Sequence, residues 1–194
     1  MLKIDYTRTA SGSEPITTAQ MKNYLRENYG TDAVEDALVD EFVKAARQWV
    51  EEQCQQSFVA QEIVLWAYDD ECLITDLPLS FGPVTAISEV VRLDEKEAET
   101  ALVFNSDYYV LGLSDKTITF NRMFSTGSVT YQPIKATYTA GYASAASIPR
   151  AIVAAIYKLA AESYVNREAS VDWSIQTVPY GVAQLIRPYQ KIQW

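Results

Sequence analysis

Residues 148–170, IPRAIVAAIYKLAAESYVNREAS, form the most apolar stretch of the chain and end in the compact motif Tyr-x-x-Arg-Glu. The apolar residues recur at helical spacing, with Ile152 and Ile156 on one face and Val153 and Tyr157 on a second. A helix that is apolar on two faces needs neighbours on more than one side. We expect it either at the centre of a monomer core or shared between a core and a subunit contact.

The charged end of this stretch holds Tyr164, Arg167 and Glu168. Tyr164 and Glu168 are four residues apart and share a helix face, which Arg167 flanks. Arginine cannot act as a base at neutral pH, whereas it binds carboxylates and helix-end carbonyls well. We therefore interpret the three residues as a lock that fixes the helix or as part of a subunit interface, and not as a catalytic trio.

Further helices are expected towards both ends of the chain. Thr17 and Gln20 have the spacing of a capping box, and a second, longer helix follows over about residues 32–58. A last short helix is stopped by Pro188. The long helix has a wide apolar face, and its solvent side is expected to carry the charged residues Asp36, Asp40, Lys44, Arg47 and Glu51. The first residues, MLKIDYTRTASGSEP, look unstructured and have no apolar segment of a signal peptide, so we expect synthesis in the cytosol.

Between residues 59 and 139 the apolar pattern changes to a period of two, which predicts about six or seven strands. The strands are expected to be antiparallel, because no helical stretch intervenes to make parallel crossovers. The fold class is therefore α+β, a helical frame of two N-terminal and two C-terminal helices with an inserted antiparallel sheet or small sandwich. The expected parts are 1–58 (helices), 59–146 (sheet) and 147–194 (helices and a tail) in one domain.

The composition excludes the common catalytic sites. The chain has no histidine, which removes the usual general base, zinc ligand and partner of a nucleophile. Its two cysteines, Cys54 and Cys72, are interpreted as reduced thiols, and the isolated glycines form neither a dinucleotide fingerprint nor a P-loop. We expect no catalytic residue, no cofactor and no metal. The apolar run in the C-terminal helix is too short to span a bilayer, so no membrane is expected either.

Charge is unevenly distributed along the chain, whose net charge is −9. Residues 1–140 carry 11 basic and 22 acidic side chains, while residues 141–194 carry 5 basic and 3 acidic ones. An acidic body of this kind does not bind nucleic acid by neutralising phosphates.

The order of motifs resembles that of the head–tail connector (adaptor) proteins of long-tailed bacteriophages, prophages and gene-transfer particles. The resemblance covers most of residues 15–190, and its motifs are ITTAQMKNYLR, WVEEQCQQSF, LPLSFGPVTAISEVVRLD, DYYVL, ATYTAGY, IPRAIVAAIYKLAAESYVNRE and VPYGVAQLIRPYQ. It implies a non-enzymatic structural protein of the virion neck that assembles in the host cytoplasm. Copies would form a ring, twelvefold by resemblance, beneath the portal protein, where the ring extends the DNA channel and provides the platform for the next neck, stopper or tail-completion protein.

Two groups of residues follow from this resemblance. Acidic residues that face a channel would repel DNA phosphates and let the DNA slide, and the candidates are Glu35, Asp36, Asp40, Glu51 and Glu52. The end of the chain is expected to dock on the portal through basic, aromatic and aliphatic residues, namely Arg187, Pro188, Tyr189, Lys191, Ile192 and Trp194. The alternative for the tail is that Trp194 folds back onto its own core.

Two other functions stay open on the sequence alone. One is another neck or tail-completion protein of the same virus type. The other, from a different class, is a small α+β enzyme or ligand-binding domain, which a deep pocket with clustered carboxylates would favour.

Overall fold

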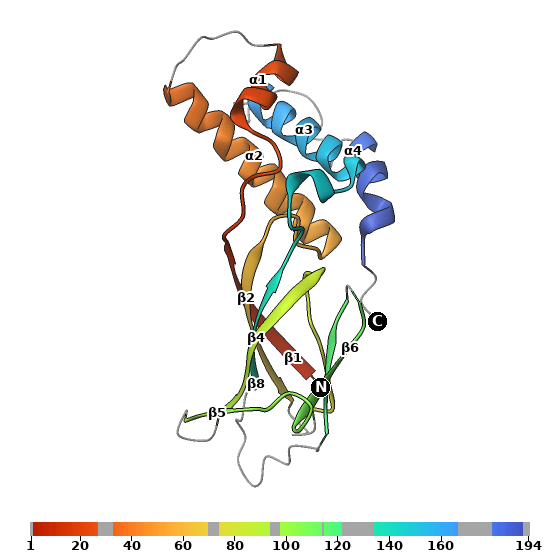
Figure 1. The fold of residues 1–194 in the computed structure, drawn as a ribbon. Helices are drawn as coiled ribbons and strands as arrows, with labels where there is room; N and C mark the ends of the chain where they lie inside the picture. The colour runs from red at the N-terminus through yellow and green to blue at the C-terminus, as the bar shows by residue number, and fades with distance from the viewer. Residues whose placement is uncertain are drawn as a thin grey trace. The chain divides into compact units, whose positions relative to one another are not determined.

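The computed structural model describes residues 2–26, 33–69, 74–93, 98–113, 115–121, 134–166 and 180–191. The chain divides into two compact units. The sheet unit consists of Met1–Gly12 and Ala60–Gly141, and the helical unit consists of Ser13–Val59 and Tyr142–Trp194. All strands that the structure describes belong to the first unit and all described α-helices to the second, which confirms the α+β prediction (Figure 1).

The sheet unit contains two antiparallel sheets. The five-stranded sheet has the order β1 (Leu2–Ala10), β2 (Gln61–Asp69), β8 (Ile134–Ala140), β4 (Val84–Leu93) and β5 (Glu99–Ala101). The three-stranded sheet has the order β3 (Asp76–Pro78), β7 (Thr117–Phe120) and β6 (Tyr108–Leu111). The predicted period of two is clearest in β8, where buried and half-buried residues alternate along the whole strand.

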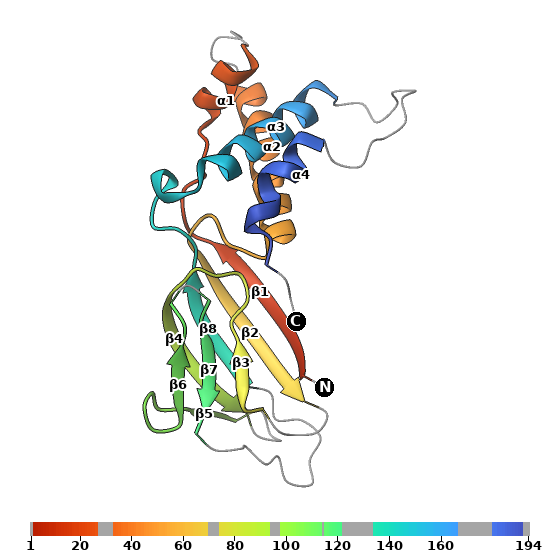
Figure 2. The ribbon, with the colours of Figure 1, turned by 90° about the vertical axis from the view of Figure 1, so that its right-hand side faces the viewer.

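The two sheets face each other as the layers of a small sandwich, as Figure 2 shows. Both contribute to one apolar core, with Ile63, Leu65 and Tyr138 from the larger sheet and Leu77 and Ile118 from the smaller one. The hydroxyl of Tyr138 donates a hydrogen bond of 2.8 Å to a backbone carbonyl of the β3–β4 connection. Burial raises the pKa of this phenol above its usual range, and the bond satisfies its polar end inside the core.

The beginning of the chain corrects the sequence prediction. Residues expected to be unstructured, and assigned with the helices in the 1–58 part, form β1 in the sheet unit. The strand pairs with β2 at nine successive positions, from Leu2 opposite Asp69 to Ala10 opposite Gln61. Two further hydrogen bonds of 2.9 Å, from the backbone N–H groups of residues 11 and 12 to the Ala60 carbonyl, extend this pairing to the edge of the unit.

The helical unit contains α1 (Thr18–Leu25), α2 (Ala33–Cys54), α3 (Arg150–Val165) and α4 (Tyr180–Ile186), with short 3-10 turns at Ala145–Ser147 and Arg187–Tyr189. The predicted capping box is present, because the Thr17 hydroxyl accepts from the Gln20 backbone and the Gln20 side chain accepts from the Thr17 backbone. Helix α2 ends earlier than predicted, where Gln55 adopts a left-handed φ of 52°.

Helix α3 lies at the centre of the helical core. Its side chains Ile152, Ala155, Ile156, Ala160 and Tyr164 are buried, and it packs against α1, α2 and α4. Three helical neighbours account for its two apolar faces, so the first of the two expected explanations, a central helix of a monomer core, is sufficient. Among the described residues, no helix is both long and apolar enough to cross a membrane.

Candidate functional site

The predicted docking tail begins in contact with the helical unit. Helix α4 anchors it, because Val182 and Ile186 are fully buried in the helical core. Beyond α4, the Gln56 side chain donates a hydrogen bond of 2.8 Å to the Tyr189 carbonyl. The Lys191 backbone N–H donates one of 3.3 Å to the Cys54 carbonyl. These bonds attach the chain to the C-terminal end of α2 as far as residue 191.

The tail residues differ in their surroundings. Arg187 and Pro188 are exposed, whereas Tyr189 is half-buried and packs against the helical core, so it is not a free anchor. Ile192 and Trp194 lie outside the described residues, and so does the alternative in which Trp194 folds back. The portal contact of the tail stays a prediction.

Tyr164, from the predicted lock, meets a residue assigned to another group. Its buried side chain donates a hydrogen bond of 2.7 Å to the Glu35 carboxylate, and its ring lies edge-on to Phe42 at 6.4 Å. Both contacts join the end of α3 to the first half of α2. Arg167 and Glu168 lie outside the described residues, so their share in the lock stays a prediction.

The five acidic residues expected to face a channel do not form a uniform surface. Glu35 accepts the bond from Tyr164, Asp36 pairs with Lys22, and Asp40 pairs with Lys44 at 2.7 Å. The hydrogen bond to Asp40 is the largest cause that raises the pKa of Lys44 above its usual range. Glu52 is half-buried near the end of the helix. Glu35, Asp36 and Asp40 therefore each bind a side chain of the helical unit.

Glu51 is the candidate that the structure contradicts. Its side chain is only 1% exposed, and Arg47, also expected on the solvent side of α2, is only 3% exposed. Arg47 binds Glu14 through two nitrogens, at 2.8 and 3.1 Å, and binds Glu51 through a third at 2.7 Å. The other oxygen of Glu51 accepts from the Phe58 backbone N–H at 2.7 Å. Glu51 is therefore a buried structural residue and cannot line a channel.

The sequence does not predict this buried network, because only one of its two ion pairs, the one between Arg47 and Glu51, is visible as a local spacing. The i,i+4 spacing of Arg47 and Glu51 is visible, but it is equally typical of a solvated helix face. The other ion pair is the contact with Glu14, which precedes α1 and lies 33 positions before Arg47 in the chain. Such a contact cannot be found from local periodicity.

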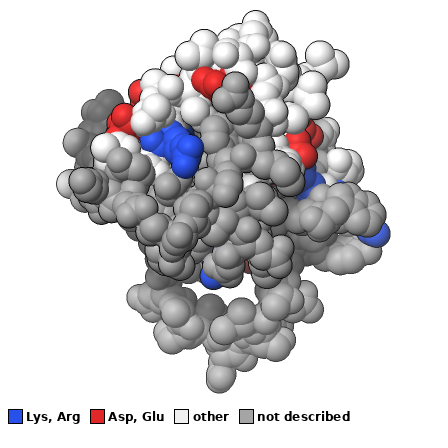
Figure 3. Space-filling view, turned by 90° about the horizontal axis from the view of Figure 1, so that it is seen from below, with Lys and Arg blue, Asp and Glu red and all other residues white. Residues whose placement is uncertain are grey.

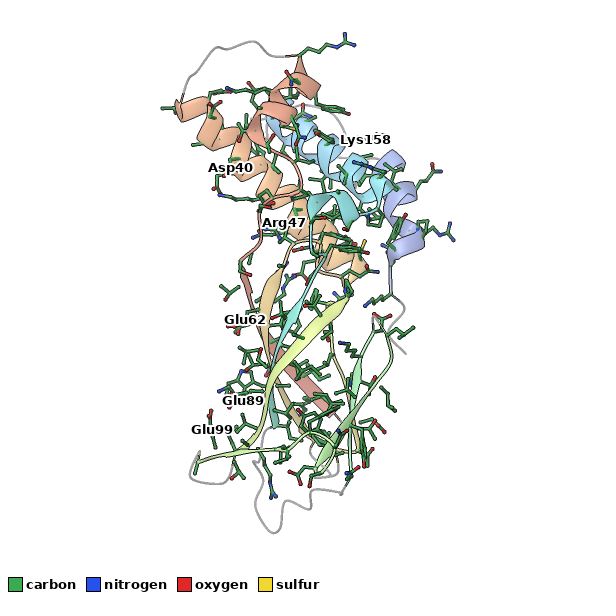
Figure 4. All side chains as sticks on the ribbon, viewed as in Figure 1. Asp40, Arg47, Glu62, Glu89, Glu99 and Lys158 are labelled. Carbon is green, nitrogen blue, oxygen red and sulfur yellow. The ribbon has the colours of Figure 1, made fainter. Side chains whose placement is uncertain are left out.

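Exposed acidic side chains occur instead on the outer face of the five-stranded sheet. Glu62 and Glu89 are exposed on β2 and β4, and Glu99 on β5 is exposed while it pairs with Lys135 at 2.8 Å. Figure 4 shows the three labelled glutamates along one side of the sheet unit. Glu62 was detectable in the sequence as a polar position of an alternating strand, but it was not singled out.

The described residues contain no group of three or more His, Cys, Asp and Glu side chains that could hold a metal ion. Cys54 is fully buried, its thiol contacts the Ile186 carbonyl, and burial raises its pKa to about 11. A thiol of this kind is protonated at neutral pH and is a poor nucleophile.

Comparisons with solved structures identify the fold. A chain in the neck of an empty gene transfer agent (GTA) particle, computed with C6 symmetry, superimposes with a TM-score of 0.75 at 19% identity. A chain in the virion of the native GTA particle gives 0.74 at 19% identity, and one in the neck of the native particle, computed with C12 symmetry, gives 0.67 at 17%. Each match covers 97% of both chains. No family model and no curated protein matches the sequence. The chain thus has the fold of these particle proteins over its whole length.

Proposed function

We propose that this chain is a non-enzymatic structural protein in the neck of a phage-like particle, a head–tail connector (adaptor). Copies form a ring beneath the portal, extend the DNA channel and present a platform for the next neck or tail-completion protein. The observation that carries the proposal is the fold likeness to chains from GTA necks, which covers 97% of each chain. Because both units are matched, the likeness extends to the helical frame and to the inserted sheets. The C6 and C12 symmetries of those necks support a ring of twelve copies.

The portal contact in this proposal lies at the end of the chain. The hydrogen bonds at Tyr189 and Lys191 fix the backbone on the helical unit, and the next residues are apolar Ile192 and aromatic Trp194. A short segment that leaves a fixed point loses less conformational entropy on binding than a free tail. Exposed Arg187 adds a positive charge beside the segment.

The DNA channel in this proposal needs acidic surface without strong phosphate binding. Of the predicted group, Glu35, Asp36, Asp40 and Glu52 remain candidates and Glu51 does not. Exposed Glu62 and Glu89 on the sheet unit are additional candidates, since neither is assigned to an ion pair in the described residues. Repulsion between such carboxylates and phosphates is screened beyond about 10 Å at 0.1 M salt, so only residues close to the DNA would contribute.

The decisive experiment is to mix the purified chain with the portal protein of the same particle and to image the complexes by electron microscopy. We expect a closed ring stacked on one end of the portal. A chain that never associates with the portal, but joins purified tail components, would overturn the connector role and favour the alternative of a tail-completion protein.

A truncation after Lys191 tests the docking tail more sharply than removal of residues 188–194. The shorter deletion keeps the bonds of Tyr189 and Lys191 to the helical unit, so the fold is expected to be unchanged. We expect loss of portal binding for the truncation and for Trp194→Ala, and wild-type binding for the matched control Gln193→Ala. Equal binding of all variants would refute the docking role of this segment.

A further inference from the structure

Exposed apolar side chains gather on one strand of the sheet unit and its flanking loops. Of the nine large apolar residues that are exposed among those described, five lie between residues 103 and 113. They are 44% to 95% exposed, and they form the β6 patch: Val103, Phe104, Tyr109, Leu111 and Leu113. A concentration of this kind on a protein with a real core marks a surface that another molecule covers.

The β6 patch is held in place by its own hydrogen bonds. The Asp107 carboxylate accepts from the Val103 backbone at 2.8 Å, and the Asn105 N–H donates to the Tyr108 carbonyl at 2.9 Å. The Phe104 ring lies 5.7 Å from the ring of Tyr108, whose side chain is buried in the sandwich. The loop before β6 is therefore pre-organised, which reduces the entropy lost when a partner binds.

Strand β6 also lies at an edge of its sheet. It pairs with β7 on one side and is the last strand in the order β3-β7-β6. An edge strand can add a strand from another molecule through its backbone, while exposed Tyr109 and Leu111 supply apolar contacts on the outer face.

The opposite rim of the sheet unit is formed by β1, the outermost strand of the larger sheet, and Figure 2 shows β6 and β1 on opposite sides of the sandwich. Half-exposed Tyr6 packs its ring edge-on against Phe81 at 4.8 Å, and the Arg8 guanidinium lies 4.2 Å from the centre of the same ring. Both side chains lie on the face of β1 that packs on the core, yet Tyr6 stays 38% exposed and Arg8 is only half-buried. Tyrosine and arginine, with tryptophan, are enriched among the residues that contribute most to protein interfaces.

We propose that the β6 patch of one copy binds the β1 rim of the next copy around the ring. The inference rests on the proposed ring function and names the surfaces that build it. A head-to-tail ring needs two different surfaces, and a ring of twelve rotates each copy by only about 30°, so the two surfaces must lie on nearly opposite sides. The β6 patch and the β1 rim meet this requirement, since they lie on opposite sides of one sandwich.

Charge favours an apolar contact between copies. Each copy carries a net charge of −9, so two copies repel each other over longer distances. In the view from below, the charged side chains of the described residues are scattered among neutral ones and form no continuous patch of one sign (Figure 3). The five patch residues carry no charge, and the β1 rim carries Lys3, Asp5 and Arg8, a net charge of +1, so this pair of surfaces does not bring two acidic surfaces together.

The first test replaces two exposed patch residues by a strand-forming polar residue. The variant Leu111→Thr/Leu113→Thr and the matched control Val34→Thr/Val165→Thr, equally exposed but in the helical unit, are each mixed with portal. Native mass spectrometry then counts the copies bound to each portal. We expect full rings for wild type and control, and at least about tenfold weaker filling of the ring for the patch variant, with single copies still bound to the portal.

The outcomes separate the two proposals. A wild-type chain that forms no ring refutes the proposed function, and the inference falls with it. A ring that forms equally well with the patch variant, at an unchanged unfolding temperature, refutes the inference alone.

A second test identifies the opposing surface. Thr7→Cys on β1 and Leu113→Cys beside β6 are purified separately, mixed on the portal and treated with a short bismaleimide, with the wild type as reference for the native cysteines. We expect a covalent dimer in the mixture and none with either variant alone. A dimer with Leu113→Cys alone would mean that two patches meet, and rings without any cross-link would mean that another surface is used. Either result overturns the proposed pairing.

Discussion

The buried network of Arg47, Glu51 and Glu14 makes the sharpest prediction about stability. In the variant Glu51→Gln, the side chain keeps its shape and loses one acceptor oxygen and its charge. Both oxygens of Glu51 are in use, one by Arg47 at 2.7 Å and the other by the Phe58 N–H at 2.7 Å. An amide has a single oxygen, so its NH2 group must face one of these two donors.

The expected cost follows from these contacts. Losing one charge-assisted hydrogen bond costs about 1.5–3 kcal/mol, and removing one charge of a buried pair costs about 3–5 kcal/mol. Glu14 remains bound to Arg47 through two nitrogens and keeps that charge compensated, which places the expected loss towards the lower end. We expect Glu51→Gln to lower the free energy of unfolding of the helical unit by about 3 kcal/mol.

Urea unfolding followed by far-ultraviolet circular dichroism measures this loss, since the signal at 222 nm reports the helical unit. The matched control is Glu52→Gln, the next residue of α2, which is half-buried and is expected to cost below about 1 kcal/mol. In addition, the double variant Arg47→Met/Glu51→Gln is expected to lose less than the sum of the single variants, because the two residues share one network. A Glu51→Gln variant as stable as Glu52→Gln would refute the reasoning.

Three further predictions concern single contacts of the helical unit. Tyr164→Phe removes the bond to Glu35 and is expected to cost about 1–2 kcal/mol in urea unfolding; an unchanged midpoint would contradict the contact. Thr17→Ala removes half of the capping box with Gln20 and is expected to cost about 1 kcal/mol, read from thermal unfolding at 222 nm. Burial raises the pKa of Cys54 from about 9 to about 11, so between these pH values the unfolded chain binds fewer protons than the folded one. The contribution of this thiol to the free energy of unfolding is therefore fully present below pH 9 and is lost as the pH rises to 11. Urea unfolding at pH 8 and pH 10 measures this fall, which Cys54→Ala should reduce.

The elements that the sequence predicted well are those whose signal is local. The capping box at Thr17, the end of the last α-helix before Pro188 and the alternation in β8 each depend on a few neighbouring residues, and each is present in the structure. The wide apolar face predicted for the long helix is likewise present in α2, where Val39 and Val43 are buried in the helical core. Local signals therefore sufficed for the fold class.

The errors share a different cause, which is pairing over long sequence distances. Strand β1 has a charged residue, Arg8, at a position that faces inward, and it is stabilised by β2 more than fifty residues later. A weak alternation with charges reads as an unstructured start, because the partner that completes it is not adjacent. The burial of Glu51 has a similar origin, since Phe58 binds it and Glu14 binds its partner Arg47 from outside the helix. The exposed residues of the β6 patch were missed because alternation predicts two faces but does not tell which face a partner covers.

The division of the chain has a consequence for how the protein is made on the ribosome. Each unit is assembled from two separated segments of the chain. Strand β1 is synthesised before its sheet neighbours β2 and β8, and α2 is synthesised before α3 and α4, against which it packs. Neither core can therefore close while the first half of the chain emerges, and the helices made first expose their apolar faces until residues beyond 150 have been translated. Folding of both units is expected late and nearly together, so an incomplete chain would lack the surfaces on which the proposed ring depends.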